Sequence, residues 1–590
     1  MPSTWLTFRK SITLCIVLRV LFALGLDFYL SAPRFVGLAQ DIELDIHDAS
    51  LRSEIRSGSN PVVEFITTGP GLFSASSPLT SYMNLKECMW LYKKGIDPYG
   101  MGQIGLSPLY LSFSYLPSVT PSTTSTPTTS TLLRFLSTLL DILIWTTPDA
   151  LSAWFLVRIW KMRSSSSSSF DESTESSVKS FGSLTKSSSA SSDASSKTVS
   201  TSPTRSPKPT STSYASSQSS STSSIDALLP IICLLSPFQI LPSLARSTST
   251  WENAVLLGAV AFGSEVGAYQ AIGEPTNAAA HEQTSAREER VCSRLGNEPS
   301  SKSKSLLLLA LRIHLSLDAV ILLPPMVMLI LSSPRSRLTE PGGFEFGAFW
   351  KRAMATSLKT TQDSKAIPQS KSTSKIIYSV LLEFFVYWTI LTLISTIIVG
   401  HWGWIGATWG ASLSLPSLTP NPGVWWYFFT EMFDHFRPFF LVVFDVHLLM
   451  YVAPFCIKFQ HDSLYALFLL TGVLATLKPY PTLSDHALFI ALWGIFQEIF
   501  PYLTHPIPTI LVLLPSSLLQ PLFAHLWLTH GTGNANFYYA STLVGACAGG
   551  MAVVDAVKAG LRCALEKKKQ NRATEMEDWE EEEREVVTQQ

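Results

Sequence analysis

The sequence predicts an all-α polytopic membrane protein with 10–12 transmembrane helices, about 12 being the best count, since each span needs about 20 apolar residues. Two observations support this class. Hydrophobic residues make up 46% of the 590-residue chain and charged residues only 15%, against about 25% charged in soluble domains. The apolar residues also gather in repeated runs of span length, which argues against a soluble multi-domain enzyme.

The N-terminal region, residues 1–163, is predicted to hold an uncleaved first span at 11–30 and a long or broken helix at 132–160. A loop at 31–110 joins them. The segment 164–224 is dominated by Ser and Thr and is predicted to be a disordered cytosolic linker, because it cannot bury a core.

The middle region, 225–332, is predicted to contain spans at 225–243, 251–270 and 305–331, with a flexible insertion at 271–304. The last of these runs contains Pro324 and Pro325, which favours two short helices. A cytosolic loop at 333–375 follows.

The C-terminal region, 376–565, is predicted to carry six spans, and a charged tail at 566–590 follows them. The spans are 376–400, 425–453, 463–478, 486–503, 508–529 and 537–561. Basic residues cluster in three places: just after residue 157, within loop 333–375, and just after residue 566. Because Lys and Arg favour cytoplasmic loops, both termini are predicted to be cytosolic. No basic helix face with interleaved aromatics occurs, so no nucleic-acid partner is predicted.

The opposite, lumenal face is predicted to carry ordered loops at 31–110, 401–424, 478–485 and 530–536. These loops are rich in Pro, Gly, Asn and aromatic residues. Their Trp residues fit an interfacial aromatic belt, and such a shaped surface could dock a polar headgroup or a partner domain.

The most informative stretch is WWYFFTEMFDHFRPFF, residues 425–440. Glu431, Asp434 and His435 are spaced i, i+3 and i+4, so one helical face would carry them. Charged groups inside a span cost about 2.5–3.5 kcal/mol each. The patch therefore either meets a lipid headgroup or a partner, or forms an internal network with Arg437 that locks helices.

Two further polar groups have similar alternatives. Lys478 and Asp485 flank a Pro-Tyr-Pro turn that could bind a ligand or simply be rigid. The amides of Asn534 and Asn536 could bind a sugar or phosphate, or cap the last helix.

No complete catalytic constellation is found, and no cofactor or metal is predicted. The seven cysteines form no CxxC or Cys/His metal spacing, and neither GxSxG nor HExxH occurs. The acids Asp41, Glu43 and Asp45 alternate with apolar residues. A lipid-linked-sugar transferase could use such closely spaced carboxylates, although an alternation of acidic and apolar residues is commonly just a solvated amphipathic segment. A transporter would predict an internal repeat of spans, and none is evident.

Four stretches resemble the PIG-U family, the multi-spanning subunit of the GPI transamidase complex. They are SPLTSY at 77–82 with LYKKGIDPY at 91–99, LTPNPGVWWYFFTEMFDHFRPFF at 418–440, KPYPTLSD at 478–485, and FAHLWLTHGTGNANFYY at 523–539. The resemblance is strongest over about 375–562.

The resemblance implies a fold similar to the membrane region of GPI-pathway glycosyltransferases, without their activity. It implies a non-catalytic subunit in the endoplasmic reticulum membrane that helps recognise the GPI lipid or the attachment signal. Its partners would be a cysteine protease-like catalytic subunit, accessory membrane subunits and the GPI glycolipid. The expected binding residues are Phe428, Phe429, Glu431, Asp434, His435, Phe436, Lys478, Tyr480, Asp485, Asn534 and Asn536. The alternative function is a lipid-linked-sugar-dependent glycosyltransferase of the same pathway.

Overall fold

The computed structural model describes residues 2–30, 76–100, 105–115, 131–184, 228–272, 298–331, 373–528 and 531–588. Within these ranges every regular element is a helix, so the predicted all-α class is confirmed for the described part of the chain. The helices are α1 (Pro2–Leu30), α6 (Tyr82–Lys93), η1 (Pro108–Tyr115), α7 (Thr131–Leu184), α9 (Pro237–Leu244), α10 (Ser249–Ile272), α12 (Glu298–Leu315), η2 (Leu317–Leu322), α13 (Leu323–Leu331), α15 (Thr373–Val399), α16 (Trp404–Ser414), α17 (Trp425–Thr430), α18 (Arg437–Met450), α19 (Val452–Lys458), α20 (Ser463–Leu477), α21 (Leu483–Trp493), η3 (Gln497–Tyr502), α22 (Pro506–Leu528) and α23 (Ala535–Thr588).

Five helical segments in the described ranges are long and apolar enough to cross a membrane. They are Thr138–Ser164, Ile377–Val399, Arg437–Lys458, Pro506–Leu528 and Ala535–Gln570. Shorter apolar helices lie at Ile12–Gly25, Leu317–Leu331, Ser463–Leu477 and Leu483–Trp493. The chain is therefore built as a membrane protein.

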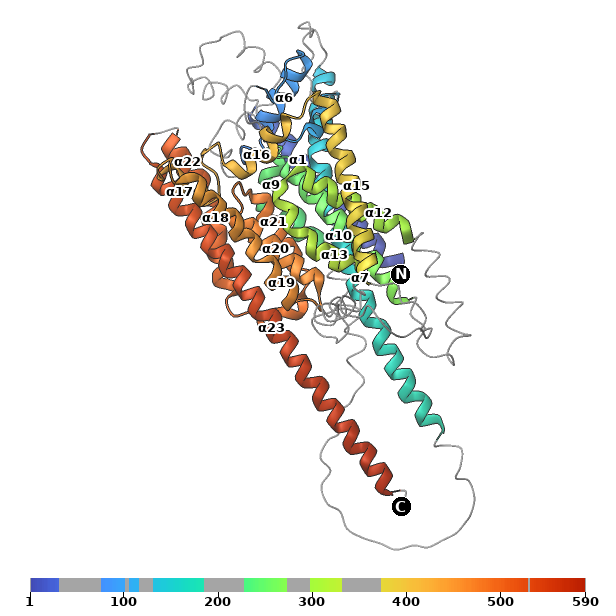
Figure 1. The fold of residues 1–590 in the computed structure, drawn as a ribbon. Helices are drawn as coiled ribbons and strands as arrows, with labels where there is room; N and C mark the ends of the chain where they lie inside the picture. Colours follow the sequence, from blue (N-terminus) through green and yellow to red (C-terminus); the bar gives the residue numbers. More distant parts are fainter. Residues whose placement is uncertain are drawn as a thin grey trace, which may run out of the picture.

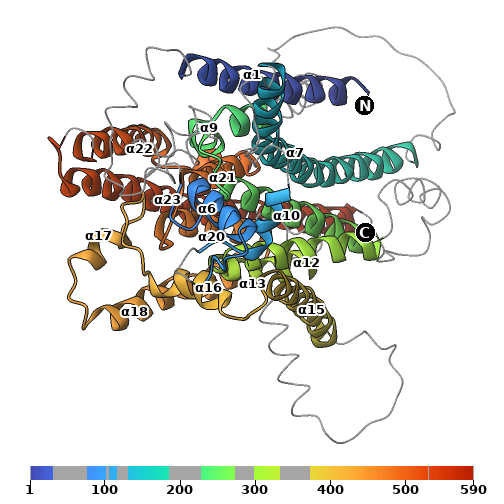
Figure 2. The ribbon, with the colours of Figure 1, turned by 90° about the horizontal axis from the view of Figure 1, so that it is seen from above.

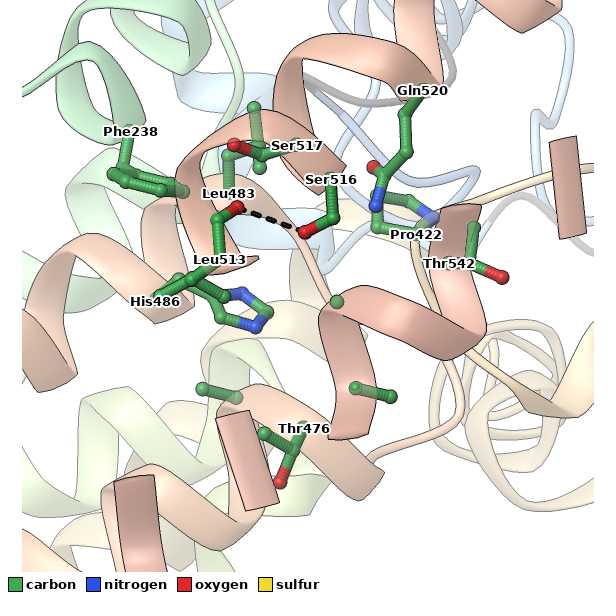
Figure 3. Close-up of a pocket in the computed structure, with 13 residues that line it drawn as sticks. Phe238, Pro422, Thr476, Leu483, His486, Leu513, Ser516, Ser517, Gln520 and Thr542 are labelled. Atoms are coloured by element: carbon green, nitrogen blue, oxygen red, sulfur yellow. Dashed lines mark hydrogen bonds between the residues drawn. The ribbon is translucent and has the colours of Figure 1, made fainter. Parts of the chain in front are cut away.

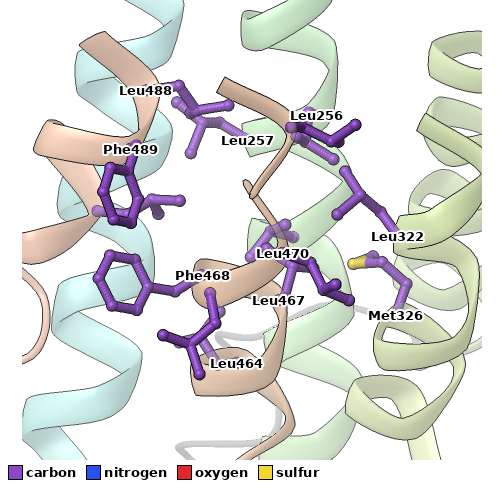
Figure 4. Packing of buried hydrophobic residues seen from close by; sticks show 14 of the residues in the cluster. Leu256, Leu257, Leu322, Met326, Leu464, Leu467, Phe468, Leu470, Leu488 and Phe489 are labelled. Carbon is purple, nitrogen blue, oxygen red and sulfur yellow. The ribbon is translucent and has the colours of Figure 1, made fainter. Parts of the chain in front are cut away.

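Helix α20 forms the centre of the bundle. All its residues except the last are buried, which is typical of a helix that is apolar all round and enclosed by others. Leu467 and Phe468 of α20 pack among side chains of α10, α13 and α21 (Figure 4). Close approach to α21 and α23 depends on Gly472, where a Cβ atom would lie 2.6 Å from the Phe489 ring.

The predicted span at 425–453 is not one helix, and this correction matters for the site. Helix α17 ends at Thr430, a turn covers 431–436, and α18 begins at Arg437. Pro438 occupies the first turn of α18, where its missing N–H and fixed φ favour a helix start. The predicted break within 305–331 is present, but it lies at Ser316 between α12 and η2.

Helix α7 also departs from the prediction, because it continues to Leu184 into the segment expected to be disordered. Ser and Thr are weak helix formers, yet their propensity differs from that of good formers by well under 1 kcal/mol per residue. Likewise α12 already begins at Glu298, within the predicted insertion. Residues 185–224, the rest of the predicted linker, lie outside the described residues.

The two ends of the bundle differ in character. Helices α6, α16 and α17 and the turn between α22 and α23 lie at one end, which we call the loop end (Figure 1). At the other end α7 and α23 extend beyond the bundle (Figure 1). Backbone hydrogen bonds join the loops, from Gly105 N to Ala407 O (3.0 Å) and from Thr248 N to Thr80 O (3.1 Å). Two of the loops predicted to share one face, 31–110 and 401–424, are thus joined where they are described, and the assignment of this end to one side of the membrane stays a prediction.

Candidate functional site

Two of the motif stretches meet directly at the loop end. The indole N–H of Trp425 donates to the carbonyl oxygen of Leu477 over 2.8 Å. The Tyr480 hydroxyl donates to the Ser417 carbonyl, also over 2.8 Å. Burial raises the pKa of Tyr480 above its ordinary value, so this hydroxyl stays protonated and keeps donating. The stretch 418–440 is thus fixed to the turn 478–485.

The third stretch joins through Tyr427. Its hydroxyl donates to the side-chain oxygen of Asn536, and its ring stacks on Tyr539 with centroids 4.5 Å apart. The side chain of Asn534 accepts from the backbone N–H of Phe537 over 3.1 Å, which is the helix-capping alternative. Of the predicted pair, Asn536 therefore lies against α17 and Asn534 caps α23.

Lys478 and Asp485 form a buried ion pair. The Lys478 Nζ lies 2.8 Å from each carboxylate oxygen of Asp485. The backbone N–H and hydroxyl of Thr482 also donate to Asp485, over 2.7 and 2.9 Å. The backbone donation is one half of the capping box that starts α21, and the backbone N–H of Asp485, which donates to the Thr482 side chain, is the other half. These contacts support the rigid-turn alternative, and a ligand-binding role for Lys478, Tyr480 and Asp485 stays a prediction.

The acidic patch occupies a turn, so the expectation that Glu431, Asp434 and His435 share a helical face is wrong. The helix stops at Thr430, and all three side chains are exposed. Asp434 pairs with Arg437 over 2.7 Å and is 88% exposed, so screening by solvent makes this pair weak. All three side chains are therefore accessible to a ligand or partner.

Aromatic rings surround this turn. Phe429 is fully buried, whereas Phe428 is partly exposed and stacks on Phe444 with centroids 5.3 Å apart. Phe433 and Phe436 are exposed, with 79% and 53% of their surface accessible. Exposed aromatic rings at the end of a span are typical of the membrane interface and of interaction sites. We call residues 431–436 with Phe428 the aromatic–acidic turn.

Two small cavities lie close to the motif stretches, and neither was predicted from the sequence. One is lined by polar side chains, which include Thr80, Glu252, Asp318, Ser412, Lys478 and Tyr480. The sequence signal that could have found it is the acid within an apolar run, at positions 252 and 318.

The second cavity lies between α20, α21, α22 and α23 (Figure 3). His486, Ser516 and Gln520 contribute polar atoms to its wall. Gly545 also lines it, and a Cβ atom there would lie 3.2 Å from the Ser516 hydroxyl.

No group of three or more His, Cys, Asp or Glu in the described ranges could hold a metal ion. Asp41, Glu43 and Asp45, the acids that a transferase could use, lie outside the described residues. The described part of the site thus consists of interfacial aromatic rings, exposed charges and buried polar pairs.

These features define the class of protein as an all-helical membrane protein with a structured, polar loop end. A family model described as GPI transamidase subunit PIG-U matches residues 63–545. The match covers more than half of the chain, and the chain therefore belongs to the PIG-U family.

Curated relatives agree with the family. The chain is 39% identical over 175 residues to the GPI transamidase component GAB1 of Saccharomyces cerevisiae, covering 29% of this chain and 44% of the relative. It is 37% identical over 154 residues to the GPI-anchor transamidase component PIGU of Homo sapiens, covering 26% and 35%. For the GAB1 homolog of Schizosaccharomyces pombe the identity is 41% over 142 residues, covering 24% and 35%. The matched part thus spans less than half the length of these relatives.

Proposed function

We propose that this chain is a non-catalytic subunit of the GPI transamidase complex that helps recognise the GPI lipid or the attachment signal. Its membership of the PIG-U family and the names of its relatives support the subunit role. Catalysis belongs to a separate cysteine protease-like subunit, and accessory membrane subunits complete the complex.

We further propose that the protein lies in the endoplasmic reticulum membrane with about 12 spans and a fold similar to GPI-pathway glycosyltransferases. Both termini are then cytosolic, and the loop end is lumenal. The extension of α7 and α23 on the side opposite the loop end (Figure 1) supports this orientation, because these helices lead into the Ser-rich and charged segments.

The aromatic–acidic turn is the proposed recognition element. One observation carries the proposal: exposed charged and aromatic side chains are held by motif residues that are themselves buried and hydrogen-bonded. Phe429 and Trp425 are buried beneath the turn, and Arg437 Nη2 donates to the Phe429 carbonyl over 3.3 Å. A rigid base that presents exposed polar and aromatic groups suits a glycolipid headgroup or a peptide.

The test replaces Glu431, Asp434 and His435 by Ala singly and together. A GPI-anchored reporter at the cell surface is measured alongside recovery of the intact complex. We expect the triple variant to assemble normally and to lower the reporter several-fold, because exposed residues contribute little to folding. Glu566→Ala is the matched control, since Glu566 is also an exposed acid but lies towards the other end of α23.

Normal reporter levels in the assembled triple variant would rule out the turn as the recognition element. If less complex assembles but the reporter level per assembled complex is normal, these side chains act in packing instead.

A further inference from the structure

Asp445 is a carboxylate placed inside a transmembrane segment. It belongs to α18 and to the candidate span Arg437–Lys458. At about 1.5 Å per residue, it lies about 12 Å along the helix from Arg437. An ionisable side chain at such depth is costly unless a partner or a water-filled cavity receives it.

Several buried acids in the helices have basic partners within the chain. Asp149 pairs with Arg19 over 2.6 Å and Glu252 with Arg312 over 3.2 Å. The fold therefore pairs acids inside its bundle, as expected for charges removed from water.

Asp445 differs from these acids. No described residue forms a hydrogen bond or an ion pair with its carboxylate, and the charged group that acts on it is Asp318, another acid. Asp318 itself accepts from the Ser412 hydroxyl over 2.8 Å. Two residues along α18, His447 is hydrogen-bonded to Tyr451 over 2.9 Å. The described chain thus offers Asp445 no cation.

Asp445 lies at the border between the buried and the exposed faces of α18. Leu441 and Leu448, four residues before it and three after it, are buried, whereas Val442 and Leu449, three before and four after, are 61% and 53% exposed. Of the 18 most apolar consecutive residues in this span, only 17% are buried within the chain. Seen from above, α18 lies at the rim of the molecule (Figure 2).

We propose that the exposed face of α18 contacts a transmembrane helix of a partner subunit, and that a Lys, Arg or His on that helix pairs with Asp445 at the edge of this face. Lipid tails cannot neutralise a carboxylate, whereas a helix satisfies its own backbone and can bring a cation to this depth. The inference rests on the proposed subunit role, because it needs a neighbouring membrane protein.

The experiment places a photo-crosslinking amino acid at Val446, next to Asp445, in the full chain within native membranes. Val446 is 49% exposed. We expect a crosslink to a transmembrane peptide that contains a basic residue, identified by mass spectrometry. Asp445→Asn should lower the yield at least about tenfold, because removing one partner of a buried pair weakens binding strongly. Leu511 on α22, which is 65% exposed, is the control position, where Asp445→Asn should change nothing.

A second measurement separates docking from folding. The purified chain carrying Asp445→Asn should keep the thermal midpoint of wild type, since Asp445 has no partner inside the described chain. Asp445→Lys should abolish the crosslink, and exchanging the identified basic residue for Asp in the same cells should restore it.

Crosslinks to lipid alone, a captured helix without a basic residue, or an unchanged yield for Asp445→Asn would each overturn the inference. If wild type still co-purifies with transamidase subunits in that case, the proposed function stands. If wild type co-purifies with none of them, both proposals fail.

Discussion

Removal of the Asp485 carboxylate is the most severe single change that the loop end offers. Asp485 accepts three hydrogen bonds, one from Lys478 and two from Thr482, over 2.7 to 2.9 Å, and the Lys478 ammonium also lies 2.8 Å from its second carboxylate oxygen. The Lys478 side chain is 5% exposed and that of Asp485 is 9% exposed. Asp485→Ala would remove the carboxylate that pairs with the buried Lys478 ammonium.

The expected cost follows from these contacts. Breaking a buried ion pair by removing one partner costs about 3–5 kcal/mol. Loss of the capping box at α21 adds about 1 kcal/mol. The free energy of unfolding should therefore fall by about 4–6 kcal/mol, a large share of the roughly 5–15 kcal/mol that is typical of folded proteins.

Lys478→Met with Asp485→Asn is the matched comparison. This double variant leaves no unpaired charge, and its amide oxygen still accepts from the Thr482 backbone, so it should recover most of the loss. The assay is unfolding of the purified chain in mixed micelles. If Asp485→Ala changes the free energy of unfolding by less than about 0.5 kcal/mol, as an exposed substitution would, the buried-pair argument is refuted. A double variant no better than the single one would refute it equally.

Three further changes test other contacts. Gly472→Ala should lower the free energy of unfolding by about 1–3 kcal/mol through overpacking, because the new Cβ would lie 2.6 Å from the Phe489 ring; near-wild-type unfolding would contradict this packing. Tyr427→Phe removes the hydrogen bond to Asn536, and we expect faster cleavage at the loop end in limited proteolysis; unchanged cleavage would contradict a role for this contact. Burial raises the pKa of the Cys88 thiol to about 12, so maleimide at pH 8 should label it in SDS and leave it unmodified in native membranes; rapid native labelling would contradict its burial.

Much of the helical architecture could be predicted because apolar run length is a strong signal. The run predicted at 463–478 corresponds to α20, Ser463–Leu477, and the run at 508–529 to α22, Pro506–Leu528. The break at 431–436 was missed because apolar residues continue on both sides of it. Pro438 was the available signal, since Pro favours the first turn of a helix over its interior.

The site was predictable in its parts but not in its contacts. The residue types at 427, 478 and 536 indicated polar groups within an apolar chain. The hydrogen bond from Tyr427 to Asn536 joins residues 109 positions apart, and a single sequence holds no information on which distant pairs meet. Burial of Lys478 likewise follows from neighbouring helices and not from its own motif.

The contacts separate the motif residues into two roles. Lys478, Tyr480 and Asp485 are buried and satisfied within the chain, so substituting them should act first on stability. Asp434 and His435 are exposed and lie on the turn that follows the buried Trp425 and Phe429, so substituting them should leave stability nearly unchanged. A functional effect of the second group without a stability effect would therefore be direct evidence of recognition, whereas the first group can affect function through folding alone.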